Sequence, residues 1–128
     1  MKTLISGLPG LPPAAGPYSS AVVAEGKFGF VSGILPYSHE KKAVVRGTIE
    51  EQTELVIDNV RRIVEAAGST LEDVVNCKVY LSAFNQETFK AMNGVYERYF
   101  GTSKPSRTTL GVQLLNVDVE IDCIFRLN

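Results

Sequence analysis

The stretch from Pro105 to Arg126, PSRTTLGVQLLNVDVEIDCIFR, constrains the fold of this chain more than any other. Successive side chains of a β-strand point to opposite faces, and both halves of this stretch alternate in polarity. We therefore predict a β-hairpin with one core face and one polar face. The core face would hold Thr108, Leu110, Val112, Leu114, Val119, Ile121, Cys123 and Phe125. Arg107, Thr109 and Glu120 would lie on the polar face, where charged groups are costly to desolvate without a partner or a task.

The N-terminal third of the chain predicts an arm, a hairpin and a loop. Residues 1–18 are rich in glycine and proline, which predicts an ordered arm without regular structure. Residues 19–24 and 27–35 are β-rich runs separated by Glu25-Gly26, a pattern that predicts a first β-hairpin. Residues 36–47 are polar, and we expect a loop there with at most a short edge strand.

The middle of the chain predicts two helices around one strand. Thr48 and Glu51 form a capping box ahead of apolar residues at helical spacing, which predicts a helix from about residue 49 to 67. Residues 74–81 alternate in polarity as a half-buried strand does. Asn85 is placed to cap a second helix that ends near Gly101. Its apolar stripe of Phe89, Met92, Tyr96 and Phe100 is expected to face the core.

These elements follow the order β-β-α-β-α-β-β and predict one α+β domain over residues 1–128. Its fold would be a single mixed β-sheet with two helices packed on one face. A chain of 128 residues can bury a core of its own. The face without helices would carry Arg107, Thr109, Glu120 and Tyr80. This mixture of charged, polar and aromatic side chains is not what a face fully exposed to solvent would carry. We therefore expect a homo-oligomer with its sites where the subunits meet.

Composition and charge narrow the expected partners. A net charge of −1 gives no field that would attract nucleic acid or an anionic membrane. The sequence has neither an apolar run of membrane-spanning length nor a targeting leader, so we expect a cytoplasmic protein. Cys77 and Cys123 both sit among apolar neighbours on predicted strands. Buried, reduced thiols are therefore favoured over a disulfide.

The residue inventory excludes most catalytic chemistry that depends on a cofactor. His39 is the one histidine, no metal-ligand spacing occurs, and neither a dinucleotide motif nor a P-loop is present. We therefore expect no metal, no cofactor and no catalytic triad. Arg107 is either a structural arginine or an anion clamp, and Glu120 is either an ion-pair partner or a site residue. Ser32-Gly33 interrupts the apolar run FGFVSGIL, which indicates either a β-bulge or the close approach of a ligand.

Six short segments in a fixed order resemble the Rid/YjgF family of reactive-intermediate imine deaminases. They are GPYSSAVVA, VSG, IVEAAG, NGVYERYF, PSR and VEID, and together they run over nearly the whole chain. The resemblance implies a chorismate-mutase-like α+β fold that assembles as a trimer, with clefts between subunits that bind small carboxylates. It also implies hydrolysis of a small 2-imino acid, such as 2-iminobutanoate, or of its enamine tautomer, to a 2-oxo acid and ammonia without a cofactor.

Carried onto this chain, the resemblance implies that Arg107 holds the substrate carboxylate and that Glu120 positions the attacking water. Tyr18, Ser32, Gly33 and Asn93 would line the cleft. If residues 105–126 form a simple hairpin, Arg107 and Glu120 lie roughly 20 Å apart along the strands. Either the two residues come from neighbouring subunits, which we favour, or the connection is not a hairpin, or one of them has no catalytic role.

The chain departs from the family pattern at three places. Thr109 stands where many deaminases of the family have cysteine, and Ile34 stands where they often have glutamine. The connection from Arg107 to Glu120 is also shorter by roughly two residues, a change that preserves the alternation of faces along a strand. These departures leave two alternatives to the small-substrate deaminase. One is a non-catalytic oligomeric module that binds small carboxylates, and the other is a specialised pathway deaminase with a larger substrate.

Overall fold

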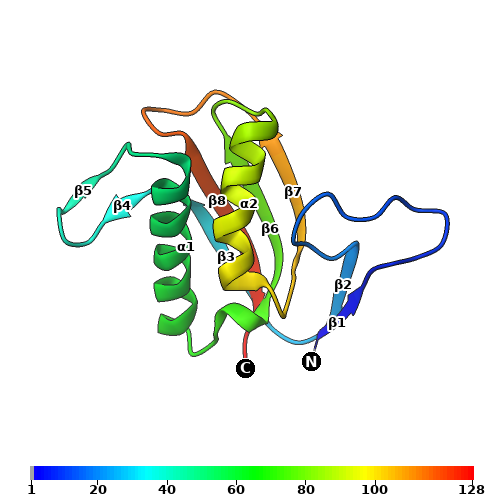
Figure 1. Cartoon of the computed structure of the whole chain (residues 1–128). Helices are drawn as coiled ribbons and strands as arrows, with labels where there is room; N and C mark the ends of the chain where they lie inside the picture. Colours follow the sequence, from blue (N-terminus) through cyan, green and yellow to red (C-terminus); the bar gives the residue numbers. More distant parts are fainter. Residues whose placement is uncertain (1) are drawn as a thin grey trace.

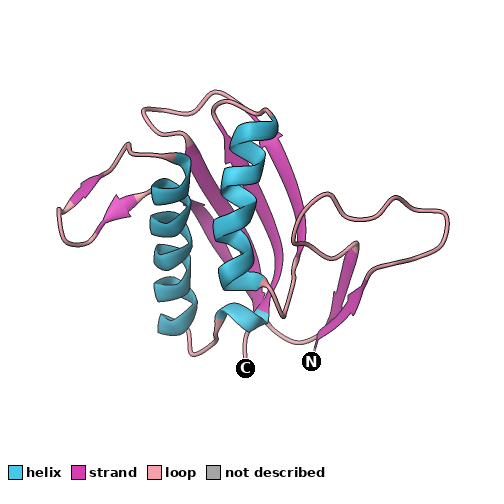
Figure 2. Ribbon diagram, in the orientation of Figure 1, coloured by secondary structure: helices cyan, strands magenta, loops and turns pink. Residues whose placement is uncertain are grey.

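The computed structural model describes residues 2–128, in which two helices cover one face of a four-stranded mixed β-sheet (Figure 1, Figure 2). The strand order is β3-β8-β6-β7, with bounds β3 (Phe28–Ile34), β8 (Val119–Arg126), β6 (Val74–Leu81) and β7 (Ser106–Gly111). The helices are α1 (Ile49–Ala66) and α2 (Gln86–Phe100). The predicted α+β class, with both helices on one side of a mixed sheet, is confirmed.

The remaining strands lie outside this sheet. β1 (Lys2–Ile5) pairs with β2 (Ala21–Ala24), and the short hairpin of β4 (Tyr37–Ser38) and β5 (Ala43–Val44) extends beyond α1 (Figure 1). A single 3₁₀ turn, η1 (Leu71–Asp73), precedes β6. Two predictions are therefore wrong. The arm over residues 1–18 contains a strand, and residues 19–24 do not form a hairpin with residues 27–35. Instead, the longer β3 pairs with the eight-residue β8, which offers it a fully buried row of side chains.

The predicted hairpin over residues 105–126 is also wrong. β7 pairs in parallel with β6, and β8 pairs antiparallel with β6 on its other side, so β7 and β8 are not neighbours. The reason is the helix between the two parallel strands. β6, α2 and β7 form a β-α-β unit, and a strand that follows such a crossover aligns parallel to the first strand.

This pairing separates the candidate residues onto two faces of the sheet. Arg107 lies opposite Cys77 in the parallel pair, and Thr109 follows two residues later on the same face, which the helices cover. Glu120 lies opposite Tyr80 on the face without helices. The prediction of one shared polar face is therefore wrong for Arg107 and Thr109 and confirmed for Glu120 and Tyr80.

Local signals predicted the helices well because capping depends on neighbouring residues. The Glu51 backbone N–H donates to Thr48 Oγ1 at 3.1 Å, and the Thr48 N–H donates to Glu51 Oε1 at 2.8 Å. Asn85 caps α2 in the same way. Cys77 and Cys123 are buried, free and directly opposite each other on β6 and β8, as predicted. Within residues 2–128, no helix is long and apolar enough to cross a membrane.

The core fills the space between the helices and the sheet. It includes Val56, Val60 and Val64 of α1, Met92 and Tyr96 of α2, Val79 and Leu81 of β6, and Val119, Ile121 and Phe125 of β8. The β-branched and aromatic residues on the strands pack into the helical stripes, which fixes the height of each strand under its helix.

Asp118 ties the connection between β7 and β8 to the rest of the fold. Its carboxylate accepts hydrogen bonds from Ser82 Oγ at 2.7 Å, Gln52 Nε2 at 3.0 Å and Arg46 Nη2 at 3.2 Å. Its backbone N–H donates to Gln52 Oε1 at 2.8 Å. The Ser82 hydroxyl, the Gln52 amide and the Arg46 guanidinium together lower the pKa of Asp118 to about 2.

We expect Asp118→Asn to lower the free energy of unfolding by about 1 to 2 kcal/mol near neutral pH, after allowance for solvent screening. The lowered pKa of the folded carboxyl means that its stabilisation is complete above the unfolded pKa and is lost as the pH falls toward about 2. Urea unfolding near pH 7 and near pH 2 should therefore show a gap between the two proteins that closes in acid. The exposed loop residue Glu40 provides the control, because Glu40→Gln should open no such gap. A gap of equal size at both pH values would contradict the role of this carboxylate.

Candidate functional site

Arg107 is a buried cation enclosed by aromatic rings. It is the second residue of β7, its exposed fraction is 9%, and α2 lies over it. The guanidinium carbon lies 4.7 Å from the ring centre of Tyr96, 4.9 Å from that of Tyr18 and 5.6 Å from that of Phe89. Burial lowers the pKa of Arg107, although a guanidinium stays protonated in proteins. The site therefore holds a positive charge in a place of low polarity.

No carboxylate of the described residues neutralises this charge, and the polar atoms around it lack partners. Nη1 of Arg107 donates to Met92 Sδ at 3.7 Å, which is a weak acceptor. Within residues 2–128, the buried side-chain atoms without a hydrogen-bond partner are Asn93 Oδ1, Tyr96 Oη, Thr109 Oγ1, and Nε and Nη2 of Arg107. All of these atoms belong to Arg107 or to residues near it. Since an unpaired buried polar group costs about 1–3 kcal/mol, this concentration indicates a ligand site.

The N-terminal arm closes one side of this site. A Cβ on Gly16 would come within 2.9 Å of Arg107 Nη2 and 3.0 Å of the Asn93 side-chain amide, so a larger residue there would have to displace one of these groups. Tyr18 follows the same turn of the arm, and its hydroxyl accepts a hydrogen bond from the Ala15 N–H at 3.2 Å. A cavity of about 190 Å³ remains open beside the guanidinium, lined by Tyr18, Phe84, Phe89, Arg107 and Thr109.

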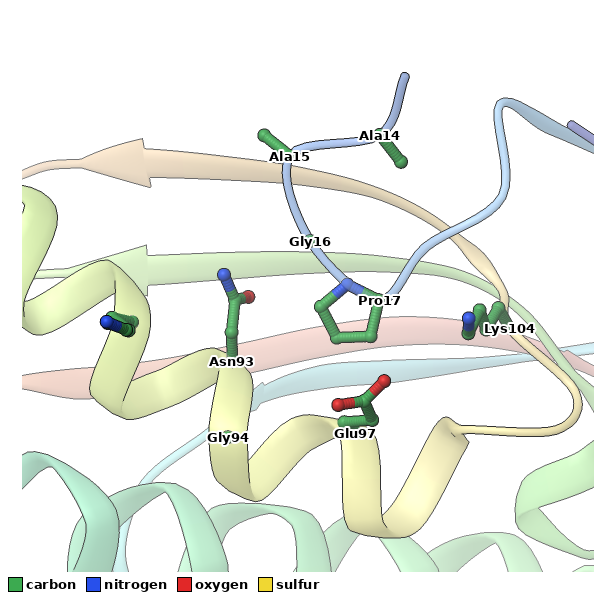
Figure 3. Close-up of a pocket in the computed structure, with 9 residues that line it drawn as sticks. Ala14, Ala15, Gly16, Pro17, Asn93, Gly94, Glu97 and Lys104 are labelled. Atoms are coloured by element: carbon green, nitrogen blue, oxygen red, sulfur yellow. The ribbon is translucent and has the colours of Figure 1, made fainter. Parts of the chain in front are cut away.

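A second hollow, of about 390 Å³, lies on the other side of the arm (Figure 3). Asn93 and Glu97 project from α2 toward the arm in this view, and Gly16 and Pro17 pass above them. Lys90 and Lys104 complete the polar wall. Asn93 thus faces this outer hollow and also approaches Gly16, which touches the guanidinium. We regard the smaller cavity as the candidate site because it contains the unpartnered cation.

A separate cluster occupies the face without helices. The pairing of β3 with β8 shifts register between Val31 and Ile34, which leaves Ser32 and Gly33 in a β-bulge, both exposed. A Cβ on Gly33 would collide with Oε2 of Glu120, so glycine is required for the carboxylate to lie there. Of the alternatives that the sequence left open at Ser32-Gly33, the bulge occurs, and the group that approaches Gly33 is the Glu120 side chain.

Neighbouring groups on this face carry further charge. The Tyr80 hydroxyl donates to Asp122 Oδ2 at 2.6 Å. This hydrogen bond, with partial burial and the nearby carboxylates, raises the pKa of Tyr80 to about 12. Within residues 2–128, no three His, Cys, Asp or Glu side chains converge as metal ligands would.

The predicted site residues therefore form two groups. Arg107, Thr109, Tyr18 and Asn93 lie together around the buried guanidinium. Ser32, Gly33 and Glu120 lie together on the opposite face. The first group places a buried guanidinium, with Nε and Nη2 unpartnered, beside a cavity of about 190 Å³. The second group offers a carboxylate base beside an exposed bulge.

Sequence reasoning missed several residues that build the first group. Phe89 and Tyr96 were assigned to the core because they share the apolar stripe of α2, yet both rings also face Arg107. Gly16 and Phe84 were not singled out. Recognition of the β-α-β unit would have placed α2 over Arg107 and so indicated the two rings. No local pattern indicates that Gly16 reaches the guanidinium, because that contact joins distant parts of the chain.

The fold and the site define a class of protein: a helix-covered mixed sheet with a buried arginine on an edge strand and a half-buried carboxylate on the opposite face. Residues 10–126 match the family described as Endoribonuclease L-PSP. The chain is 46% identical to a RutC family protein of Pyrococcus abyssi, over 87% of this chain and 85% of that protein. It is also 36% identical to Reactive Intermediate Deaminase A, chloroplastic, of Arabidopsis thaliana, over 91% of this chain and 62% of that protein.

A solved structure agrees with these sequence relationships. YyfB of Yersinia pestis, a Rid-family protein, has a TM-score of 0.86 at 22% identity and covers 98% of both chains, which shows a shared fold. The chain belongs to the Endoribonuclease L-PSP family, which is the Rid/YjgF family that its sequence motifs resemble.

Proposed function

We propose that this protein is a cofactor-free deaminase that hydrolyses 2-imino acids, or their enamine tautomers, to 2-oxo acids and ammonia. The observation that supports the proposal most directly is the buried Arg107 guanidinium, whose Nε and Nη2 have no partner in the described residues. A substrate carboxylate would satisfy both atoms through a bidentate pair and would neutralise the buried charge. The relative named Reactive Intermediate Deaminase A supports the same class of reaction.

The chemistry needs little beyond binding and one activated water. A protonated imine carbon is already electrophilic, so water adds to it when a base takes the proton of the water. The C–O bond forms as the C=N bond becomes single, and the base then gives the proton it took from the water to the amino nitrogen. The C–N bond breaks, ammonia leaves, and the hydroxyl loses its proton to the base as the C=O bond forms. Arg107 would hold the substrate carboxylate, while Thr109 Oγ1 and Asn93 Oδ1 are unpartnered groups that can orient the imine nitrogen.

Glu120 is the candidate base, and its position supports a site shared between copies. It lies on the face of the sheet opposite Arg107, so one chain cannot bring both groups to one small substrate. That face also exposes the phenyl ring of Phe30, at 76%, and Leu110 on the edge strand. Large exposed apolar groups beside charged ones favour coverage by a second chain. We propose a homo-oligomer, a trimer by family resemblance, in which Glu120, Ser32 and Gly33 of one copy meet the Arg107 pocket of another.

The test is hydrolysis of 2-imino acids generated in the cuvette from L-amino acids by an amino-acid oxidase. We expect the protein to accelerate release of the 2-oxo acid. Semicarbazide, which reacts with the imine, provides the readout, because faster hydrolysis leaves less imine for it to capture. Binding of 2-oxobutanoate without any acceleration would instead identify the non-catalytic carboxylate-binding module, which the departures at Thr109 and Ile34 favour. Failure of both binding and turnover would overturn the assignment of the pocket.

A ribonuclease function, as in the description of the family, has less support from this chain. Its net charge is −1, and the one histidine, His39, lies in an exposed turn between β4 and β5. Proteins that bind RNA neutralise several phosphates with basic side chains. RNA added to the imine assay should therefore neither be cleaved nor inhibit the reaction.

A further inference from the structure

The cavity beside Arg107 shares part of its lining with an apolar hollow. Phe84 and Phe89 line the cavity of about 190 Å³ next to the guanidinium. The same two rings, with Asn85 and Gln86, line an adjoining hollow of about 250 Å³. Phe84 and Phe89 therefore belong both to the cavity that holds the Arg107 guanidinium and the Thr109 hydroxyl and to the apolar hollow. We call the Phe84 and Phe89 side chains the aromatic wall.

The aromatic wall is held in place by the fold. The two ring centres lie 5.5 Å apart, with the ring planes tilted by 44°. A Cβ on Gly111 would come within 2.7 Å of Phe84 Cβ, so a glycine at the end of β7 lets this residue lie against the strand. The turn itself is pinned by Thr88 Oγ1, which donates to the Ala83 carbonyl at 2.7 Å. A ligand would therefore meet a preformed surface and would not have to order it.

Phe84 nevertheless remains 49% exposed. Half of a phenyl ring in water is unfavourable, and a ligand that covers it gains apolar contact. The hollow beside it is large enough for such a group, since a cavity of roughly 150 Å³ can hold benzene. A substrate with only a methyl side chain would fill the inner cavity and leave the adjoining hollow empty.

We propose that the aromatic wall is a side-chain subsite and that this protein prefers 2-imino acids with branched or aromatic hydrophobic side chains. The carboxylate would pair with Arg107, the reacting carbon would lie near Thr109, and the side chain would extend over Phe84 and Phe89. This inference rests on the proposed function, and it assigns to Phe84 the part that sets the size of the preferred substrate. A larger side chain would also cover the part of Phe84 that faces the adjoining hollow.

The decisive experiment compares imines derived from L-alanine, L-leucine and L-phenylalanine in wild type and Phe84→Ala. We expect kcat/KM of the wild type to be about tenfold higher for the phenylalanine imine than for the alanine imine. Phe84→Ala should lose most of this preference, because it should slow the phenylalanine imine more than the alanine imine. Phe84→Leu, which keeps an apolar wall, should retain the preference for the leucine imine. An unchanged ratio in Phe84→Ala would overturn the subsite.

A binding measurement separates failure of this inference from failure of the proposed function. Calorimetry with pyruvate and phenylpyruvate reports on the pocket whether or not the protein turns over an imine. We expect Phe84→Ala to weaken phenylpyruvate about five- to tenfold and pyruvate hardly at all. Tyr37→Ala is the matched control, because Tyr37 is an aromatic residue 41% exposed on β4, outside the residues that line the cavity. If wild type binds both oxo acids equally, the subsite is wrong even when deaminase activity is found.

Discussion

Arg107→Met is expected to abolish the hydrolysis of 2-imino acids and at the same time to stabilise the fold. Methionine fills a similar volume among Tyr18, Phe89 and Tyr96, but it carries no charge to desolvate. Because the guanidinium is buried without a counter-charge, its removal should raise the free energy of unfolding by about 1 to 3 kcal/mol. The loss of the carboxylate anchor should lower kcat/KM by about 10²- to 10³-fold.

The two readouts must move in opposite directions for this interpretation to hold. Urea unfolding measures the stability, and the imine assay measures the activity. Arg107→Lys serves as the comparison, because it keeps the charge and loses the planar pair of donors. We expect that variant to be slow as well, but without any gain in stability. An Arg107→Met protein that is inactive and also much less stable would indicate a structural arginine.

Two inactive variants are expected to restore activity when their chains are mixed. Arg107→Met lacks the carboxylate anchor, and Glu120→Gln lacks the base, so each protein alone should lose about 10²-fold or more. If each site takes Arg107 from one copy and Glu120 from a neighbour, random reassembly leaves both groups intact at about one site in four. Chains unfolded together in equal amounts and then refolded should recover about a quarter of the wild-type activity.

The matched control for this experiment is a mixture of Arg107→Met with Arg107→Lys, in which no reassembly can supply the missing guanidinium. That mixture should be no more active than either variant alone. The mixture of Arg107→Met with Glu120→Gln could also stay inactive although its chains exchange. That result would mean either that both groups act within one copy or that Glu120 has no role in the reaction. Size-exclusion chromatography of both mixtures confirms that the assemblies are alike.

The elements that depend on local interactions were predicted well from the sequence. Thr48 and Asn85 form the expected caps, and β6 covers the expected residues 74–81. Hydrogen bonds between a cap and its own first turn lie within four residues, so the sequence alone contains them. The α+β class followed from the order of these elements.

The pairing of the strands could not be obtained in the same way. Residues 105–126 contain two alternating strands, and their closeness in sequence suggested a hairpin. β8 instead lies between β3 and β6, where its row of Val119, Ile121 and Cys123 is covered by the helices. Which partner a strand selects depends on contacts across the whole sheet, although the helix between β6 and β7 was a sign that these two run parallel.

The wrong prediction that affected the site most was which face of β7 is buried. Leu110 and Val112 suggested a core face, yet they are 39% and 44% exposed, and Arg107 takes the buried side. On an edge strand, alternation identifies two faces but does not say which one the helix covers. The aromatic rings of α2 decide the matter, because they surround a cation and leave the aliphatic residues outside.

The placement of Arg107 and Glu120 on opposite faces has a consequence for how activity depends on protein concentration. In the proposed assembly, a solitary copy would present two halves of different sites and complete neither. Specific activity should then fall when the protein is diluted toward the dissociation constant of the assembly. Total activity should therefore decrease more steeply than in proportion to the protein concentration. Dissociation at low protein concentration would then inactivate the protein without any inhibitor.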